Sequence, residues 1–276
     1  MSTQTITMET GNAHRAVLPV GDRPPRAGAL SASIAFGWRA LLKIKHVPLQ
    51  LFDVIVHPVV FTLLFTFLFG GAVAGSTGRY LQYVVPGILA MTLLVTTGYI
   101  GSALSIDISK GVFDRFRSMP VWRPSVLVGA VLGDLVRYAI AAAGVVLFGL
   151  ALGFRPEGGP VGVLAGVLLA LVFSFSLAWL WTLLGLVMRA SNAVLGVTQA
   201  VLYPLAFFSN IFAIPASLPG WLRAFVDVNP VTHLVTAVRG LMAGTATAGQ
   251  VGWVLLASAA LTLVFAPLAM RRFSRL

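Results

Sequence analysis

Five long stretches of the sequence contain no Asp, Glu, Lys or Arg: 54–78, 80–106, 158–188, 190–222 and 240–270. A helix needs about 20 apolar residues to cross roughly 30 Å of hydrocarbon, so each stretch is long enough for one crossing. The stretch 126–154 predicts a further crossing, because its only charged residues are Asp134 and Arg137. Trimmed at Gly and Pro, the six predicted spans are 54–71, 83–105, 129–153, 161–187, 193–213 and 250–270.

The composition agrees with an all-α polytopic membrane protein. Hydrophobic residues make up 58% of the chain and charged residues only 10%, against about 25% charged in a typical soluble domain. The absence of cysteine excludes disulfides and cysteine nucleophiles, and the four scattered histidines lack metal-ligand spacing. A net charge of +11 points to nucleic acid only when it lies on a soluble domain, and no such domain remains outside the apolar stretches.

The basic residues predict the orientation of the spans. With the N-terminus inside, 14 of the 19 Lys and Arg residues fall on the cytoplasmic side and four fall outside, while Arg137 lies within a span. Cytoplasmic loops of membrane proteins carry an excess of Lys and Arg. The sequence therefore predicts a multi-pass membrane protein with both termini in the cytoplasm.

The N-terminal region precedes these spans. Residues 1–30 contain no apolar core for a signal peptide and are interpreted as a flexible cytoplasmic tail, ahead of a membrane domain over 31–276. Ser31 can cap an interfacial helix running to about His46, although a longer first span with a basic flank fits equally well.

A dense group of charges between the second and third spans reads DISKGVFDRFRSMPVWRP, residues 107–124. On a helix over 107–119, Ile108, Val112, Phe116 and Met119 share one side, and most of the charged residues lie opposite. This pattern predicts an amphipathic cytoplasmic helix that contacts a soluble partner. The alternative is an ordinary basic loop.

A second unusual segment, 215–244, lies between the fifth and sixth spans. It holds LPGWL at 218–222, then Asn229 and Pro230, then a short apolar run interrupted by Arg239. Neither half is long enough to cross the bilayer alone, so two re-entrant or interfacial helices on the outer side are predicted. A partly ordered external loop is the alternative.

The chain lacks the residues that most membrane enzymes need. No GxxxxGK[ST] motif occurs, so this chain has no P-loop for ATP. His57, Asp134 and Arg137 are the ionisable residues expected within the membrane. We expect His57 to be hydrogen-bonded at a kink before Pro58. Asp134 and Arg137 are interpreted as an ion pair that braces helices, with a role in a proton or substrate path as the alternative.

Aromatic side chains within the spans can line a path for a large apolar solute. Lipid-facing aromatics are also common, so no single one is decisive. The candidate pathway residues are Phe61, Phe65, Tyr203, Phe207, Phe208 and Asn210.

The basic N-terminal segment, the six spans, KGVFDRFRSMP at 110–120 and the outer LPGWL…NPVTHLVTAVRGLMAG together resemble the type-2 ATP-binding-cassette exporter permeases. Within that group the chain most resembles the daunorubicin/doxorubicin-resistance permeases of actinobacteria. The resemblance covers about residues 35–276.

The resemblance implies a transport subunit that is not itself an enzyme and that exports a hydrophobic drug, natural product or lipid. ATP and Mg²⁺ would bind two copies of a separate ATPase subunit, a second permease copy or close homologue would complete the complex, and spans one and five would line the path. The implied coupling residues are Lys110, Gly111, Phe113, Asp114, Arg115, Phe116, Arg117 and Pro120.

Three other functions remain as alternatives. An ion-coupled secondary transporter needs ionisable residues at mid-membrane and often an internal repeat, and the sequence shows neither convincingly. A membrane enzyme needs a convergent catalytic set, and a purely structural anchor would have no effect on solute flux.

Overall fold

The structure is a computed structural model that describes residues 48–111, 125–188, 190–212 and 219–275, together with Ala35, Gly37 and Trp38. Within these ranges the regular elements are all α-helices, and no strand occurs. The helices are α2 (Pro48–Ala74), α3 (Thr77–Ser109), α5 (Ser125–Leu152), α6 (Gly159–Val187), α7 (Ser191–Phe207), α8 (Gly220–Val228), α9 (Pro230–Ala243) and α10 (Ala248–Ser274). The predicted all-α fold is therefore confirmed for the described part of the chain.

Six of these helices lie where the sequence predicted spans. Four of them, α3, α5, α6 and α10, are long and apolar enough to cross a membrane. The apolar part of α2, Val56–Gly71, and the 17-residue α7 are shorter. The fifth predicted span, 193–213, was too long at its C-terminal end, because α7 ends at Phe207 and residues 208–212 form turns.

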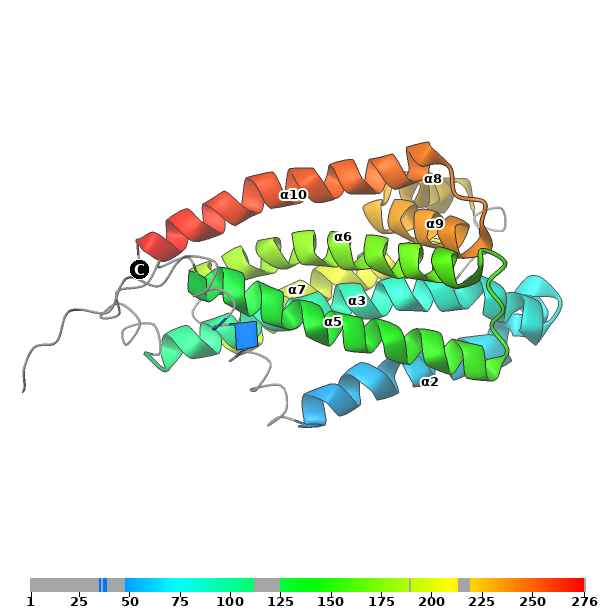
Figure 1. Ribbon diagram of the computed structural model, residues 1–276, viewed down its shortest axis with the longest axis horizontal. Coiled ribbons are helices and arrows are strands. Elements are labelled where there is room, and N and C mark those ends of the chain that lie inside the picture. Colours follow the sequence, from blue (N-terminus) through cyan, green and yellow to red (C-terminus); the bar gives the residue numbers. More distant parts are fainter. Residues whose placement is uncertain are drawn as a thin grey trace, which may run out of the picture.

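Helix α3 is the central helix of the bundle. It packs against α2, α5, α6, α7 and α9. Of its most apolar 18-residue stretch, 94% is buried inside the protein, against 17% for α10. Figure 1 shows α10 along one edge of the bundle beside α6, and large apolar side chains of α10, such as Leu256 and Leu263, are exposed there. In a membrane protein such a surface faces lipid.

Small residues permit α3 and α6 to approach closely. A Cβ atom on Gly101 would lie 2.5 Å from the carbonyl oxygen of Trp181, and one on Gly185 would collide with the Gly101 carbonyl. The Trp181 indole N–H donates a 3.0 Å hydrogen bond to Thr97 Oγ1 across the same interface. The two helices are therefore packed in direct backbone contact.

Two short helices, α8 and α9, meet at Asn229 and Pro230, as predicted. The Asn229 side chain accepts from the Val231 N–H and caps α9, and Pro230 occupies the first helical position, where its missing N–H is not needed. Figure 1 places both helices at the end of the bundle opposite the C-terminus. Helix α9 packs on α6, α3 and α10.

The charged segment begins differently from its prediction. Asp107 lies in the last turns of α3 and does not start a separate helix. The chain turns at Lys110 and Gly111, and Gly111 has a φ of 64°, a conformation that a Cβ disfavours. Residues 107–109 therefore belong to α3 and not to a separate coupling helix. Residues 112–124 lie outside the described residues, as do the 1–30 tail and most of the predicted interfacial helix.

Candidate substrate site

A cavity of about 150 Å³ lies among α2, α3 and α7. Five of its lining residues are apolar, and the others are histidine, threonine and tyrosine. The lining comprises His57, Pro58, Phe61, Ile88, Met91, Thr92, Val95, Thr96, Tyr99 and Tyr203. A pocket that combines apolar and aromatic side chains with polar groups is typical of a binding site for an organic molecule.

A column of stacked rings forms the α2 wall. Residues four apart share one face of a helix, and the ring centroids of His57 and Phe61 are 4.5 Å apart, those of Phe61 and Phe65 5.8 Å, and those of Phe65 and Phe69 5.4 Å. Phe212, beyond the end of α7, stacks on Phe65 at 3.9 Å. Ring contacts therefore join α2 to the segment after α7, beside the cavity.

The Nε2 atom of His57 lacks the hydrogen bond expected for a histidine at a kink before Pro58. This atom is buried and has no hydrogen-bond partner in the described part of the chain. The local backbone is satisfied in another way, because the Thr62 hydroxyl donates to the Pro58 carbonyl at 2.7 Å. A buried polar atom without a partner is unusual in a folded protein and requires an explanation.

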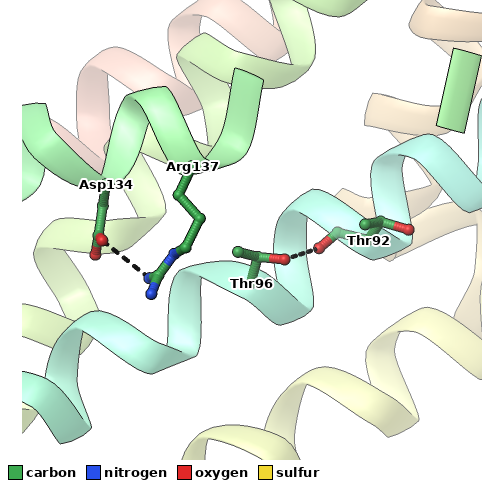
Figure 2. Close-up of polar contacts among 4 residues, drawn as sticks. All are labelled: Thr92, Thr96, Asp134 and Arg137. Carbon is green, nitrogen blue, oxygen red and sulfur yellow. Dashed lines mark hydrogen bonds and ion pairs between the residues drawn. The ribbon is translucent and has the colours of Figure 1, made fainter. Parts of the chain in front are cut away.

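Helix α3 supplies polar residues that sequence reasoning missed. Thr92, Thr96 and Tyr99 line the cavity, and Thr96 Oγ1 donates to the Thr92 carbonyl at 2.6 Å (Figure 2). Their spacing of three to four residues within an apolar helix is a signal that a pattern search can find. The sequence alone does not distinguish Thr92 and Thr96 from other threonines in a span. Their place in the cavity wall depends on the packing of α2 and α7 against α3.

Asp134 and Arg137 form the i,i+3 salt bridge, with 3.0 Å between Asp134 Oδ1 and Arg137 Nη2. Figure 2 shows Arg137 extending from α5 toward α3. Arg137 is 4% exposed, and its guanidinium carbon lies 5.5 Å from the ring centroid of Tyr99. Neither Asp134 nor Arg137 lines the cavity, but Arg137 contacts the ring of Tyr99, which does. It therefore supports the α3 wall of the cavity.

Of the six predicted pathway residues, two line the cavity, two lie beside it and two do neither. Phe61 and Tyr203 line the cavity, while Phe65 and Phe207 stack on Phe212 next to it. Phe208 lies elsewhere, 47% exposed and packed edge-on against Phe225.

Asn210, the sixth predicted pathway residue, has a structural position. Its Nδ2 donates to Thr236 Oγ1 at 2.8 Å, and its backbone carbonyl accepts from Tyr83 and Arg239. No part of Asn210 lines the cavity.

Four side chains hold the chain where α7 ends, and we call Tyr80, Tyr83, Asn229 and Arg239 the α7 clasp. Asn229 Nδ2 donates to the carbonyls of Leu205 and Phe208 at 2.7 and 2.8 Å. The Tyr80 hydroxyl donates to the Phe212 carbonyl at 2.9 Å. Carbonyls at a helix C-terminus have no partner within the helix, so the clasp satisfies the groups that the turn exposes.

Arg239 makes three contacts in the α7 clasp. Its Nε donates to the Tyr83 carbonyl at 3.1 Å and its Nη2 to the Asn210 carbonyl at 3.0 Å. The guanidinium carbon also lies 3.7 Å from the centroid of the Tyr83 ring. Carbonyl dipoles and a π face can hold a buried cation. Arg239 thereby links α9, α3 and the end of α7.

Only two of the predicted coupling residues are described, Lys110 and Gly111, and both are in the turn after α3. Phe113, Asp114, Arg115, Phe116, Arg117 and Pro120 lie outside the described residues. In the described ranges, no three His, Asp or Glu side chains are grouped so as to hold a metal ion.

Comparison with known proteins agrees with this geometry. The model of the ABC-2 type transporter family matches residues 32–243. The daunorubicin resistance ABC transporter permease protein DrrB1 of Streptomyces coeruleorubidus is 49% identical over 259 residues, which cover 94% of this chain and 92% of the relative. The probable doxorubicin resistance ABC transporter permease protein DrrC of Mycobacterium tuberculosis is 25% identical over 220 residues, or 78% of each chain. The putative transport permease ycf38 of Cyanophora paradoxa is 27% identical over 213 residues, or 74% of this chain and 71% of the relative. The chain is therefore a permease of the ABC-2 type transporter family.

Proposed function

We propose that this chain is the membrane subunit of an exporter that moves a hydrophobic drug, natural product or lipid out of the cell. The observation that carries the proposal is the cavity between α2 and α7, which is lined by Phe61 and Tyr203. These two helices correspond to the first and fifth predicted spans. The nearest charged pair, Asp134 and Arg137, lies outside the lining, so the cavity suits a solute without strong charge. The permeases of Streptomyces and Mycobacterium named above are associated with resistance to daunorubicin and doxorubicin, which favours a drug.

The energy for export comes from a separate subunit in this proposal. The chain has no P-loop motif, so ATP and Mg²⁺ bind two ATPase subunits, and two permease chains pair above them. Each permease crosses the membrane six times with both termini in the cytoplasm, and α8 and α9 lie at its outer face. This orientation follows from the distribution of Lys and Arg.

Helix α3 is suited to connect the ATPase to the cavity. One continuous helix of 33 residues runs from Thr77 to Ser109, just before the charged segment, and carries Thr92, Thr96 and Tyr99 in the cavity wall. The Ser105 hydroxyl also donates to the Met188 carbonyl at 3.1 Å, which ties this end of α3 to the end of α6. A push on residues 112–124 would therefore displace α3 and α6 together and change the cavity, as alternating access requires.

Purification of the tagged chain from its native membrane tests this proposal. We expect an ATP-binding-cassette ATPase to accompany it, and apolar aromatic solutes to stimulate ATP hydrolysis by the purified complex. Reproducible isolation of the chain without any ATPase, together with solute transport by the chain alone, would contradict the proposal and favour a secondary transporter.

A further inference from the structure

We propose, resting on the export function above, that Phe65, Phe207 and Phe212 form a closed gate on the outer side of the cavity and that movement of α2 opens it. We call these three side chains the phenylalanine gate. In this proposal the end of α7 stays fixed, and the part of α2 that carries Phe65 moves away from it.

The phenylalanine gate lies one helical turn beyond the cavity. Phe65 follows the lining residue Phe61 by four positions in α2. Phe207 follows the lining residue Tyr203 by four positions in α7. Four residues advance a helix by about 6 Å. In this direction both helices run toward the end of the bundle that holds α8 and α9 (Figure 1), so the gate lies between the cavity and the proposed outer face.

The ring of Phe212 fills the space between the two helices. It stacks on Phe65 with 3.9 Å between the ring centroids and an interplanar angle of 18°, and on Phe207 with 5.4 Å between the centroids. Its centroid is also 6.4 Å from that of Phe61 in the cavity wall. Phe212 is 9% exposed. Ring contacts therefore bridge α2 and α7 at the outer end of the cavity.

Hydrogen bonds fix the α7 side of the gate. The Phe212 carbonyl accepts from the Tyr80 hydroxyl at 2.9 Å, and Asn210 Nδ2 donates to Thr236 Oγ1 of α9 at 2.8 Å. The other members of the α7 clasp donate to further carbonyls of the same segment. Movement of this segment would leave several buried polar groups without partners, which is costly.

The α2 side of the gate is held differently. Within residues 56–71, whose side chains the structure describes, neither threonine donates to another helix. The Thr62 hydroxyl donates to the Pro58 carbonyl of α2 itself, and Thr66 Oγ1 is buried without a partner in the described part of the chain. Stacked rings can separate without breaking a hydrogen bond, so α2 can leave the gate at lower cost than α7.

Phe65 also lies between two points at which α2 can bend. Pro58 is inside the helix and has no N–H to donate, and Gly70 and Gly71 form a pair near its end. A Cβ atom on Gly70 would lie 2.9 Å from Thr77 Cα, so α2 is anchored against the start of α3 there. The helix between these points can therefore bow outward while its end stays in place.

Cysteine labelling tests the gate without ATP, because the natural sequence contains no cysteine. Met91→Cys places a thiol in the cavity lining, and Thr92→Cys provides a second position. Intact cells that express the full chain with its ATPase subunit are treated with trimethylammonium ethyl methanethiosulfonate. This reagent carries a permanent charge and does not cross the bilayer, so the rate of modification measures access to the cavity from outside.

Phe65→Ala and Phe212→Ala each delete one ring of the gate. We expect each to speed modification by about fivefold or more, because the deleted ring leaves a space. Phe208→Ala is the matched control, since Phe208 is 47% exposed and packs edge-on against Phe225. Its rate should equal that of the intact gate. Leucine, which also lacks a ring, replaces alanine in any variant that size-exclusion chromatography shows to be misfolded.

Modification of the intact gate as fast as that of the Phe65 and Phe212 variants would overturn the proposal, because the cavity would then be open to the outside. Variants at Phe65 and Phe212 that react no faster than Phe208→Ala would overturn it as well.

Two cross-links test which side of the gate moves. Phe65→Cys with Phe212→Cys joins α2 to the segment after α7, whereas Asn210→Cys with Thr236→Cys joins that segment to α9. Both pairs replace side chains that are in contact. Each pair is bridged by a short bis-methanethiosulfonate reagent in inverted vesicles that also contain the ATPase subunit. Uptake of an aromatic solute with external ATP is compared before and after dithiothreitol cleaves the link.

We expect the link between positions 65 and 212 to reduce uptake to the level without ATP, because a locked gate prevents the change of access, and cleavage to restore it. The link between positions 210 and 236 is expected to leave most of the uptake intact. Uptake that survives the first link, or stops with the second, would overturn the assignment of the moving helix. If unlinked vesicles show no ATP-driven uptake, the export function fails, and the labelling rates alone decide whether the gate exists.

Discussion

At the scale of single residues, the side chains that hold the end of α7 come from distant parts of the sequence. Asn229 is the clearest case, because its one amide group satisfies the carbonyls of Leu205 and Phe208 and its oxygen caps α9. The side chain is 3% exposed, so water does not replace these hydrogen bonds. Asn229 joins the α8–α9 segment to the C-terminal end of α7.

Replacing Asn229 by Asp tests this link without changing the shape of the side chain. The carboxylate can still accept from the Val231 N–H, but it cannot donate to the two carbonyls and is repelled by them. We expect a loss of roughly 2–4 kcal/mol in the free energy of unfolding, since each unsatisfied buried group costs about 1–3 kcal/mol. Thermal unfolding of the detergent-solubilised chain, followed by circular dichroism, measures the effect.

Asn192→Asp is the matched control, because Asn192 is exposed in the first turn of α7. A carboxylate there interacts favourably with the helix dipole, so little change is expected. Equal unfolding temperatures for the two variants would show that Asn229 does not stabilise the end of α7.

The residue scale is also where prediction from sequence was weakest. The spacing of Asp134 and Arg137 predicts their salt bridge because both residues lie on one helix. The unpartnered Nε2 of His57 and the donors to the end of α7 depend on contacts between helices far apart in the chain. A single sequence does not contain that information.

At the scale of elements, gaps between charges place the helices well because a span must exclude charge over about 20 residues. The predicted spans 83–105 and 161–187 lie within α3 and α6, which extend a few residues beyond them. The end of α7 was misplaced because residues 208–212 contain no charged residue but are held in turns by the α7 clasp. Hydropathy alone does not distinguish a helix from a turn that is satisfied by side chains.

The contact between α3 and α6 predicts a strong effect of one added methyl group. Gly185→Ala would drive a Cβ into the Gly101 carbonyl, so the helices must separate. Overpacking of this kind typically costs about 1–3 kcal/mol. We expect a lower unfolding temperature and a smaller yield of folded protein, measured by fluorescence-detected size-exclusion chromatography after heating.

Gly252→Ala in α10 is the control for this change. A Cβ at Gly252 meets nothing within 4 Å, and alanine has the higher helix propensity. Its stability should equal or slightly exceed that of the wild type. If Gly185→Ala behaves in the same way, α3 and α6 are not locked together by this contact.

At the scale of the whole molecule, the charged segment after α3 connects the bundle to its proposed partner. We expect the double substitution Arg115→Glu and Arg117→Glu to uncouple ATP hydrolysis from transport, because charge reversal opposes docking on the ATPase subunit. The permease should remain in the membrane at normal levels. Solute-stimulated hydrolysis in vesicles that contain both subunits measures the loss.

Arg271→Glu with Arg272→Glu is a control of equal charge change, since both residues are basic and lie in the last turn of α10. This pair is expected to retain most of the coupling. Wild-type transport by the Arg115 and Arg117 variant would reject the assignment of residues 112–124 as the coupling segment.

ATP-driven flux through the complex tests the central claim most directly. Inverted membrane vesicles that contain the chain and its ATPase subunit are supplied with ATP in the external medium, which the ATPase faces, and uptake of a fluorescent aromatic solute is followed with and without an ionophore that dissipates the proton gradient. We predict uptake that requires ATP hydrolysis and is unchanged by the ionophore. Uptake that collapses with the proton gradient while ATP is held constant would contradict ATP-driven export and identify the chain as an ion-coupled transporter.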